Sequence, residues 1–282
     1  MTMTKNLKFS LSKTISFLFL GIMSIVWITP VLWGLFTSFK SEMEIMQSSY
    51  RFLPINWIIS NYTRILFSTS TPVLRWFFNS MFISISHTIL VVIIVSITAY
   101  GYTRLEFKGR DKIFYFLMGT MMFPGIVNLI PLYAIVNAFG WINHPLAVIV
   151  PGTAGVFNIF LVRQFMSGIP KEFDESAKID GATDLQIFIK IMLPLIKPVL
   201  TVVAMFSFVG SWNDFLWPSI IFNDVRNLPL TPGLQLLQGA FTTQIGALLA
   251  GAIFALIPTF VLYLFVQKYF VESLSLSSGV KG

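Results

Sequence analysis

Several residue types that support chemistry are scarce or missing from this 282-residue sequence. It contains no cysteine and only two histidines, His87 and His144, which lie far apart in the chain. A disulfide or a thiolate metal site is therefore excluded, and neither a metal centre nor a Cys–His catalytic pair is expected. The sequence also lacks the Gly-x-x-x-x-Gly-Lys-Ser/Thr pattern, so the chain does not bind ATP through a phosphate-binding loop. We expect no catalytic residue, metal or cofactor in this chain.

Charged residues are also scarce. They make up 11% of the chain, less than half of the roughly 25% found in soluble domains. Hydrophobic residues make up 55%, and the mean hydropathy is +0.78. This composition is typical of a protein that crosses a lipid bilayer several times. The net charge of +7 would suit nucleic-acid binding, but its placement along the chain indicates membrane orientation instead, and no nucleic acid is expected as a partner.

Long charge-free runs divide the sequence into transmembrane segments. About 20 mostly apolar residues cross a bilayer as a helix. The run from 113 to 162 is long enough for two helices joined at 140–145, and Pro229, Pro232 and Gly233 favour a loop after 227. The sequence therefore predicts an all-α polytopic membrane protein with six transmembrane helices. They are expected at 14–39, at 76–103, twice within 113–162, at 198–223 and at 246–267.

Three regions are expected along the chain. Residues 1–74 comprise the N-terminus, the first helix and an external segment; residues 75–268 form the transmembrane core; residues 269–282 form a C-terminal tail. The first apolar run is far longer than the core of about 7–15 residues in a signal peptide, so the first helix is expected to be retained. Pro124 and Pro131 in the third span favour a helix whose hydrogen-bond ladder is relaxed.

Lysine and arginine are distributed unevenly between the loops. If the N-terminus is cytoplasmic, 14 of the 19 basic residues lie on the cytoplasmic side and five on the other. Cytoplasmic loops of membrane proteins carry this excess of positive charge. We therefore expect both termini and the loop at 168–200 in the cytoplasm.

The loop at 168–200 is a charged stretch in an otherwise apolar sequence. Between 163 and 197 lie ten of the chain's 31 charged residues. Pro170 suits the first turn of a helix that we expect to run to about Asp180. Acidic residues near its start would stabilise the helix, because they interact with the positive end of the helix dipole. Gly181 suits a sharp turn after the helix. A short water-facing helix and a turn are therefore predicted.

A second helix is predicted directly after this turn. Thr183-Asp184-Leu185-Gln186 forms a capping box that opens it, and Pro194 and Pro198 are expected to bend or end it. One apolar stripe is expected along the helix, because apolar residues recur at the spacing of one helical face. Its members are Leu185, Phe188, Ile189, Met192 and Leu193.

Within this hairpin, Glu175-Ser176-Ala177 and Asp180-Gly181-Ala182 are followed by Phe188, Ile191 and Leu193-Pro194. The pattern resembles the EAA loop of permease subunits in ATP-binding-cassette (ABC) importers. Ser176 departs from the usual second alanine but is also small. In that family the loop is a cytoplasmic coupling helix that docks in a cleft of the ATPase subunit. The alternative is an ordinary cytoplasmic hairpin between two membrane helices.

The resemblance implies roles for individual residues of a coupling loop at 168–198. Glu175 and Asp180 would make polar contacts with the ATPase, and Gly181 would permit the turn. Leu185 and Phe188 would hold the hairpin to the transmembrane bundle. The ATPase-coupling residues implied in this way are Glu175, Ser176, Ala177, Asp180, Gly181, Ala182, Leu185 and Phe188.

Few ionisable side chains fall within the predicted spans. Asp214 is the one carboxylate there, and His87 lies near the middle of the second span. Polar groups at membrane depth need a partner or a wet cavity and often mark a transport pathway. Asp214, Asn213, Trp212 and His87 are therefore candidates for a pathway or gate. Two alternatives are that Asp214 anchors one helix to another and that His87 is a neutral side chain bonded to a neighbouring helix.

Two further stretches resemble sugar-uptake permeases of the maltose type. The first is Trp212-Asn213-Asp214-Phe215. The second is the closing Val280-Lys281-Gly282, which resembles the end of the second permease subunit of those systems. In the same family an Asn-Ser pair, here Asn79-Ser80, commonly marks the start of the shared core. In maltose-type systems the last external loop, 224–245 here, reaches into the binding protein. The resemblance assigns this contact to Gln238, Gly239, Ala240, Phe241, Thr242 and Thr243.

With this resemblance, the sequence predicts one of two permease subunits of a type I ABC importer of the carbohydrate-uptake family, which moves a sugar, oligosaccharide or related polyol. The implied partners are a second homologous permease, a dimeric ABC ATPase that binds ATP and magnesium, an extracytoplasmic solute-binding protein and the lipid bilayer. The implied location is the bacterial cytoplasmic membrane. The alternative is an ion-coupled secondary transporter, which would normally show more ionisable groups at membrane depth than Asp214 and His87.

Overall fold

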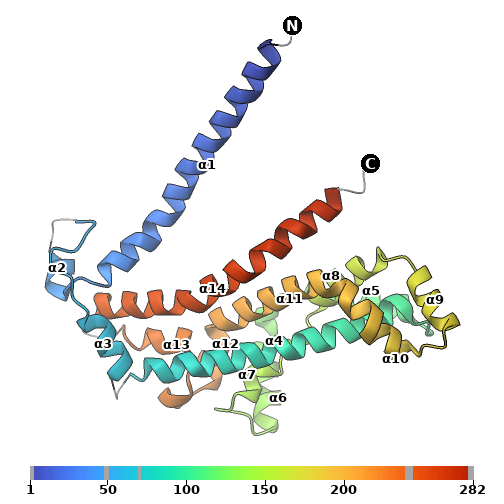
Figure 1. Ribbon diagram of the computed structural model, residues 1–282. Coiled ribbons are helices and arrows are strands. Elements are labelled where there is room, and N and C mark those ends of the chain that lie inside the picture. The colour runs from blue at the N-terminus through green and yellow to red at the C-terminus, as the bar shows by residue number, and fades with distance from the viewer. Residues whose placement is uncertain (1–2, 48–50, 69–70, 239–243, 279–282) are drawn as a thin grey trace. The chain divides into compact units, whose positions relative to one another are not determined.

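The computed structural model describes residues 3–47, 51–68, 71–238 and 244–278, and within these ranges it describes side chains from 13 to 267. The described residues form helices and no β-strand (Figure 1). The all-α class is therefore confirmed. The chain divides into two compact units: Met1–Val73 with Leu234–Phe254, and Leu74–Gly233 with Ala255–Gly282.

The first unit contains the N-terminal helix and the segment predicted to be external. Helix α1 (Met3–Thr37) has an apolar stretch at Lys13–Thr37 that is long enough to cross a membrane, as predicted. Two short helices follow, α2 (Glu42–Met46) and α3 (Ser60–Phe67). Around them, aromatic rings pack at centroid distances of 5.0 to 5.9 Å; the rings are Phe36, Phe39, Phe52, Trp57 and Tyr62.

A buried amide ties this segment together within the first unit. Asn61 is 2% exposed, and its Nδ2 donates to the carbonyl oxygens of Ser38 and Lys40, each at 2.9 Å. Helix α14 (Ile245–Ser278) begins in the same unit, where the backbone N–H of Gly246 donates to Glu42 Oε1 at 3.0 Å. A carboxylate at a helix N-terminus satisfies an amide that has no partner inside the helix.

The second unit is built on two long helices. Helix α4 (Val73–Arg104) matches the predicted second span. Helix α10 (Asp184–Ile187), the π-turn η2 (Phe188–Met192) and helix α11 (Leu193–Asn213) run on as one 30-residue helix, Asp184–Asn213. The predicted fifth span at 198–223 is therefore wrong in its bounds: it starts inside this helix and passes its end.

The π-turn explains why Pro194 does not end the helix, which also continues past Pro198. Leu193 N–H bonds to Phe188 O, five residues back, and this widened turn lies directly before Pro194, whose ring would otherwise crowd the preceding turn. The extra residue in the turn also rotates the apolar face. Leu185 and Ile189 of the predicted stripe are exposed, whereas Ile187 is fully buried, so that expectation is wrong for these two residues.

In the region 113–162, each of the two predicted spans is broken once, in addition to the predicted joint at 140–145. Helix α5 (Arg110–Thr120) is followed by the 3-10 turn η1 (Gly125–Asn128) and helix α6 (Leu129–Ala138), and the pair is bent by 94° at a break that contains Pro124. Helix α7 (Leu146–Ile149) and helix α8 (Val156–Ser167) are separated at Pro151-Gly152, where Gly152 has φ +78°. The predicted relaxation near Pro124 is thus a sharp bend.

The number of membrane-crossing helices follows from these breaks. Among the described residues, four helices are long and apolar enough to cross a membrane, and a fifth if the bent pair α5 and η1–α6 counts as one. They include the last predicted span, which lies in α14 at Ile245–Gln267. Helix α8 is apolar but has only 12 residues.

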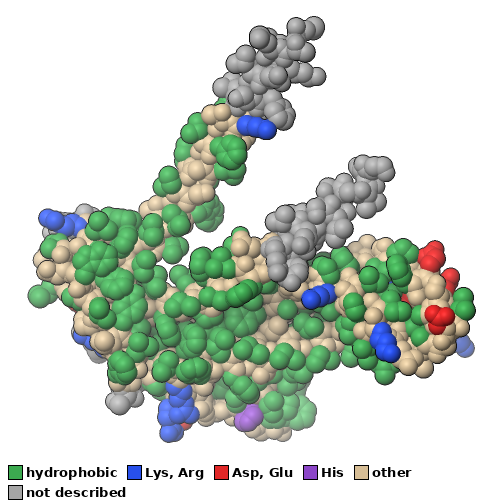
Figure 2. All heavy atoms as spheres, in the orientation of Figure 1, with side chains coloured by type: hydrophobic (Ala, Val, Ile, Leu, Met, Phe, Trp, Pro, Cys, Tyr) green, Lys and Arg blue, Asp and Glu red, His purple; other side chains and the backbone are tan. Residues whose placement is uncertain are grey.

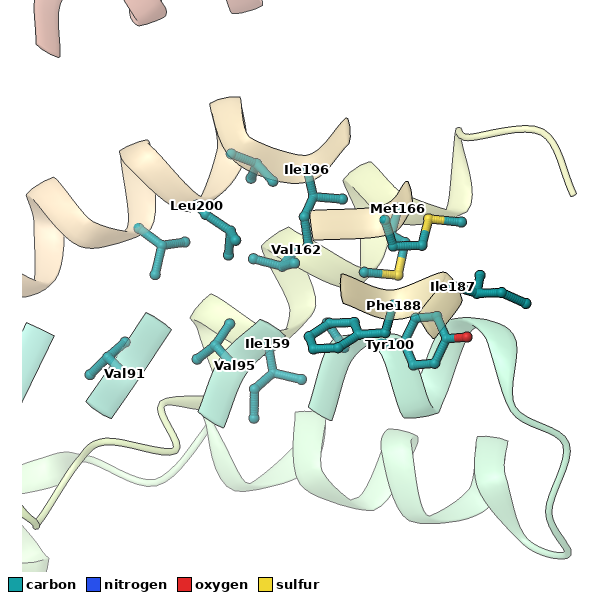
Figure 3. Packing of buried hydrophobic residues seen from close by; sticks show 14 of the residues in the cluster. Val91, Val95, Tyr100, Ile159, Val162, Met166, Ile187, Phe188, Ile196 and Leu200 are labelled. Atoms are coloured by element: carbon teal, nitrogen blue, oxygen red, sulfur yellow. The ribbon is translucent and has the colours of Figure 1, made fainter. Parts of the chain in front are cut away.

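The core of the second unit lies where α4, α8 and the long helix meet (Figure 3). Val91, Val95 and Tyr100 of α4 face Ile159, Val162 and Met166 of α8, with the long helix completing the cluster. The residues that the long helix contributes to this cluster are mainly Ile187, Phe188, Met192, Ile196, Val199, Leu200 and Val203. The base of the hairpin is therefore part of the same core as α4.

The start of α4 holds the segment that follows α11. This segment carries helix α12 (Leu216–Ile221), the turn η3 (Val225–Asn227) and helix α13 (Leu230–Gln235). Asn79 Nδ2 donates to the carbonyls of Arg226 and Leu228, and Ser80 Oγ accepts from Leu230 N–H at 2.8 Å. The loop expected after 227 therefore contains a short helix, whose first residue, Leu230, is fully buried.

Candidate functional site

The hairpin predicted to couple to an ATPase has a locally determined shape. Helix α9 (Glu172–Ile179) ends in a Schellman motif: Gly181 N–H bonds to Lys178 O and Ala182 N–H bonds to Ala177 O, at 3.0 and 2.9 Å. This motif needs a residue with positive φ, which Gly181 supplies with φ +81°. The predicted helix and the role of Gly181 as the turn residue agree with this geometry.

The capping box predicted after the turn is confirmed. Thr183 Oγ1 accepts from Gln186 N–H at 3.3 Å, and Gln186 Oε1 accepts from Thr183 N–H at 2.9 Å. An exposed ion pair joins the two limbs, with Lys178 Nζ 3.3 Å from Asp184 Oδ1. The hairpin therefore keeps its bend through backbone and side-chain bonds of its own.

The tip of the hairpin faces solvent. Glu175, Ser176, Asp180 and Gly181 are exposed, and acidic side chains gather over α9 in Figure 2. Between these polar groups lie exposed apolar side chains; Ile179 is 86% exposed and Leu185 is 65% exposed. Exposed apolar side chains among acidic ones are typical of a protein-binding surface.

The inner side of the hairpin packs on the core. Phe188 is buried and lies 5.1 Å, between ring centroids, from Tyr100 of α4, while Ala177 and Ala182 are partly buried against the same cluster. Phe188 thus holds the hairpin to the bundle as expected. The same expectation is wrong for Leu185, which points into solvent, because Ile187 takes the buried position.

An ion pair that the sequence reasoning missed lies beneath α9. Arg104 Nε, on the last residue of α4, is 3.0 Å from Asp174 Oδ2, and both side chains are largely buried. Burial raises the pKa of Asp174 above its ordinary value, and Arg104 opposes this shift. The available signal was a basic residue directly after an apolar span and an acidic residue directly before Glu175.

Two of the pathway candidates line one cavity in the second unit. This cavity has a volume of about 360 Å³ and is bounded by residues of α4, α7, α8, α11 and α12 and of the segments that follow α7 and α11. Its polar lining residues are His87, Asn158, Ser207, Ser211, Asp214 and Trp217. Asp214 is not inside a span as predicted, because it lies directly after the last helical residue, Asn213.

The polar groups of the cavity differ in their partners. His87 Nδ1 lies 2.8 Å from the carbonyl oxygen of Ile149, so His87 both bonds to a neighbouring helix and lines the cavity. The Asp214 carboxylate lies beside the backbone N–H groups of 215–217. The hydroxyls of Ser207 and Ser211 have no hydrogen-bond partner in the described part of the chain. The cavity therefore offers both fixed and available hydrogen-bonding groups.

The other two pathway candidates do not line the cavity. Trp212 is 1% exposed; its Nε1 donates to Ala255 O at 3.1 Å, and its ring stacks on Phe208. Asn213 is exposed and lies outside the cavity lining. Trp212 therefore anchors the end of α11 to α14.

The candidate contact loop for a binding protein is described only at its start. Gln238 is exposed, and its N–H bonds to Gln235 O at 3.0 Å. Gly239, Ala240, Phe241, Thr242 and Thr243 lie outside the described residues. Within the described ranges, no group of three or more His, Asp or Glu side chains could hold a metal ion.

Nearly the whole chain is similar to proteins that are already known. Residues 97–275 match the family model described as "Binding-protein-dependent transport system inner membrane component". The arabinooligosaccharides transport system permease protein AraQ of Bacillus subtilis is 32% identical over 98% of each chain. The maltodextrin transport system permease protein MdxG of the same species is 32% identical over 96% of this chain and 97% of its own.

A solved structure has the same fold. It is described as a bacterial ABC transporter involved in the import of the acidic polysaccharide alginate, and one of its chains matches with a TM-score of 0.81 and 24% identity, covering 93% of this chain and 97% of that one. The resemblance to importer permeases is thereby confirmed. The family match, the two permease relatives and the shared fold agree, and the chain belongs to the binding-protein-dependent transport system inner membrane components.

Proposed function

We propose that this chain is one of two permease subunits of an ATP-driven importer for oligosaccharides or related sugars. The observation that carries the proposal is the solvent-exposed hairpin at 172–187, which keeps its bend through its own bonds and is packed at its base into the transmembrane core. Such a hairpin can receive a displacement at its tip and pass it to the helices beneath. The permease relatives named for arabinooligosaccharides and maltodextrin support the carbohydrate class.

In this proposal α9 is a coupling helix that docks on a dimeric ABC ATPase. Ile179 and Leu185 would enter an apolar cleft, and Glu175 and Asp180 would meet polar or basic groups at its rim. Because desolvation of the apolar side chains supplies affinity and charge complementarity supplies register, the pattern fits one protein partner in one orientation. ATP and magnesium would be bound by that ATPase.

The cavity between α4, α8 and α11 is the proposed contact with the transported sugar. Sugars carry many hydroxyl groups, which need donors and acceptors when they leave water. Ser207, Ser211, Asp214, Asn158 and His87 offer both kinds of group around one space. The resemblance also supports docking of an extracytoplasmic binding protein at the loop that follows Gln238.

The membrane arrangement completes the proposal. Six crossings arise if the bent pair α5 and η1–α6 makes the third and the broken pair α7–α8 makes the fourth. Irregular backbone at membrane depth is tolerated where protein surrounds it. Both termini and the coupling loop would then face the cytoplasm of a bacterial cell, and a second homologous permease would cover the exposed apolar helix faces of this chain.

The test is transport in liposomes that contain this chain, the second permease and the ATPase, with the binding protein added outside. Radiolabelled maltodextrin and arabinooligosaccharide are the probes. Mass spectrometry of the sugars that stay bound to the purified binding protein identifies further substrates to test. ATP-dependent accumulation is expected. Accumulation driven by a proton or sodium gradient without the ATPase would refute the proposal and establish the ion-coupled alternative, which the relatives do not support.

A further inference from the structure

The side chain of Arg104 joins the end of α4 to both ends of the connection that leads into α9. Its Nη2 donates to the carbonyl oxygen of Ile169 at 2.8 Å, directly before Pro170, and its Nε lies 3.0 Å from Asp174 Oδ2 in the first turn of α9. The two charged side chains are 6% and 12% exposed. A single buried guanidinium therefore contacts the start of the hairpin twice.

The second limb of the hairpin is held one helical turn earlier on α4. Tyr100 precedes Arg104 by four residues, so both side chains project from the same face of the helix. Tyr100 Oη donates to the carbonyl oxygen of Asp184 at 3.1 Å, and its ring lies beside that of Phe188 (Figure 3). The end of α4 thus contacts the first limb through Arg104 and the second limb through Tyr100.

The charges of the pair suit the helix ends that carry them. Arg104 lies at the C-terminus of α4, where the helix dipole favours a cation, and Asp174 lies in the first turn of α9, where it favours an anion. The pair therefore selects one relative placement of two helix ends. Moving the two helix ends apart would leave a buried charge without its partner, which is costly.

The electrostatics also argue against a role in stability. Neither oxygen of Asp174 receives an aligned hydrogen bond from the described residues, so the contact is an ion pair of imperfect geometry. Burial raises the pKa of Asp174 despite the adjacent arginine, so the carboxyl ionises less readily there than in water. A buried pair of this kind contributes little to the free energy of unfolding, and its best-attested use is to specify one arrangement.

We propose that Arg104 is a positioning residue that fixes the coupling helix on the end of α4, so that α9 and α4 move as one body. The inference rests on the proposed function of the hairpin. Helix α4 also carries His87, 17 residues before Arg104 and so about 25 Å along the axis. A displacement of α9 would therefore reach the wall of the cavity along one uninterrupted helix.

The test measures the placement of α9 on α4 directly. The chain has no cysteine, so Glu172→Cys and Ile97→Cys, both at exposed positions, give two unique spin-label sites on α9 and α4, and Glu172 is not among the residues proposed to contact the ATPase. Their distance distribution is recorded by pulsed electron paramagnetic resonance in the full complex with cysteine-free partners. The variant is Arg104→Met, and the matched control is Lys178→Met, which removes the exposed ion pair of the same hairpin.

The wild type and Lys178→Met are expected to give one narrow distribution, unchanged by a non-hydrolysed ATP analogue. Arg104→Met is expected to give a distribution at least twice as wide and at least tenfold less sugar taken up per ATP hydrolysed. Arg104→Lys, which keeps the charge, should recover a narrow distribution. A distribution for Arg104→Met as narrow as that of the wild type would overturn the proposal.

A second variant distinguishes an effect on the placement of α9 from an effect on the stability of the protein. Arg104→Met with Asp174→Leu removes both charges, so no uncompensated buried charge remains and the protein is expected to melt no earlier than the wild type. Its distance distribution should nevertheless be wide. A narrow distribution in this variant, or loss of assembly in every variant, would assign the pair to stability and overturn the proposal. Absent ATP-driven uptake in the wild type would refute only the proposed function, since the distance comparison does not depend on transport.

Discussion

At the scale of single residues, two glycines occupy positions where a larger residue would not be accommodated. Gly181 supplies the positive φ of the Schellman motif, with no other atom within 4 Å of the position where a Cβ would lie. Gly246 has an ordinary φ but lies against the buried Asn61. The first glycine is needed for its conformation and the second for its size, and the two needs predict different mutant behaviour.

Gly181→Val is expected to uncouple ATP hydrolysis from uptake while the complex still assembles. A β-branched residue disfavours this conformation by about 1–2 kcal/mol, so the turn would relax and the bond from Ala182 N–H to Ala177 O would be lost. Uptake per ATP hydrolysed in liposomes should fall tenfold or more. Gly119→Val, at another open position but with ordinary φ, is the matched control. Normal uptake in Gly181→Val would contradict the role assigned to the turn.

Gly246→Ala is expected to lower the melting temperature in detergent. The new Cβ would lie 2.5 Å from Asn61 Nδ2, and displacing this amide would leave the carbonyls of Ser38 and Lys40 without a donor. The cost is about 1–3 kcal/mol for a buried unsatisfied group. Gly34→Ala, where the nearest atom is 3.9 Å away, should melt like the wild type. Equal melting temperatures for the two variants would show that the clash is relieved by local movement.

At the scale of elements, the attachment of α9 to α4 should respond to acid. Arg104 and Lys178 favour the Asp174 carboxylate, while Asp184 and Glu175 oppose it, and burial makes the net shift of its pKa upward from 3.8. Asp174 therefore takes up a proton at a higher pH in the folded state than in the unfolded state. Its contribution to stability is present at low pH and is lost as pH rises through the raised pKa, so protonation removes the ion pair without destabilising the fold.

The expected result is a wider distance distribution between labels on α9 and α4 at pH 4 than at pH 7, with no lowering of the melting temperature by this group. Asp174→Asn, which does not titrate, should give the same width at both values. Equal widening in this variant would assign the acid response to another carboxyl group.

Some elements are determined by local sequence and can be predicted from it, whereas others depend on tertiary packing. The capping box and Gly181 act through bonds between residues at most five apart, so the pattern alone predicted the hairpin. The π-turn at 188–192 was not predictable from the apolar spacing, because it shifts that spacing by one residue within a single turn. The break at Pro151-Gly152 was overlooked for a similar reason, since hydropathy stays high across it.

The candidate functional residues divide in the same way. Glu175 and Asp180 were predicted because their pattern is contiguous, whereas the pairing of Arg104 with Asp174 joins residues 70 positions apart. The shared cavity of His87 and Asp214 likewise depends on how α4 and α11 pack. Hydropathy and charge could identify each residue as unusual, but only tertiary packing brings them together. The Asn79-Ser80 pair was noticed for the family pattern, and its bonds to the 226–230 segment give the physical reason.

At the scale of the whole molecule, membrane orientation is the prediction with the widest consequence. Glu172→Cys and Val225→Cys place single thiols at exposed positions on the hairpin and on the 224–227 segment, in a chain without cysteine. A membrane-impermeant maleimide added to intact spheroplasts should label the Val225 position, and in inside-out vesicles it should label the Glu172 position. The positive-inside distribution of lysine and arginine is the physical reason. The reverse pattern would place the hairpin outside and refute ATPase coupling.

The continuous helix at Asp184–Asn213 also has a geometric consequence for the molecule. Thirty residues span roughly 45 Å, and the helix continues through both prolines without a break. A tilt of about 5° imposed at Asp184 would therefore swing the far end, where Asp214 borders the cavity, by roughly 4 Å at this rise per residue. That is more than the diameter of a water molecule, so a small rotation at the hairpin end of this helix would change the width of the cavity at the opposite end.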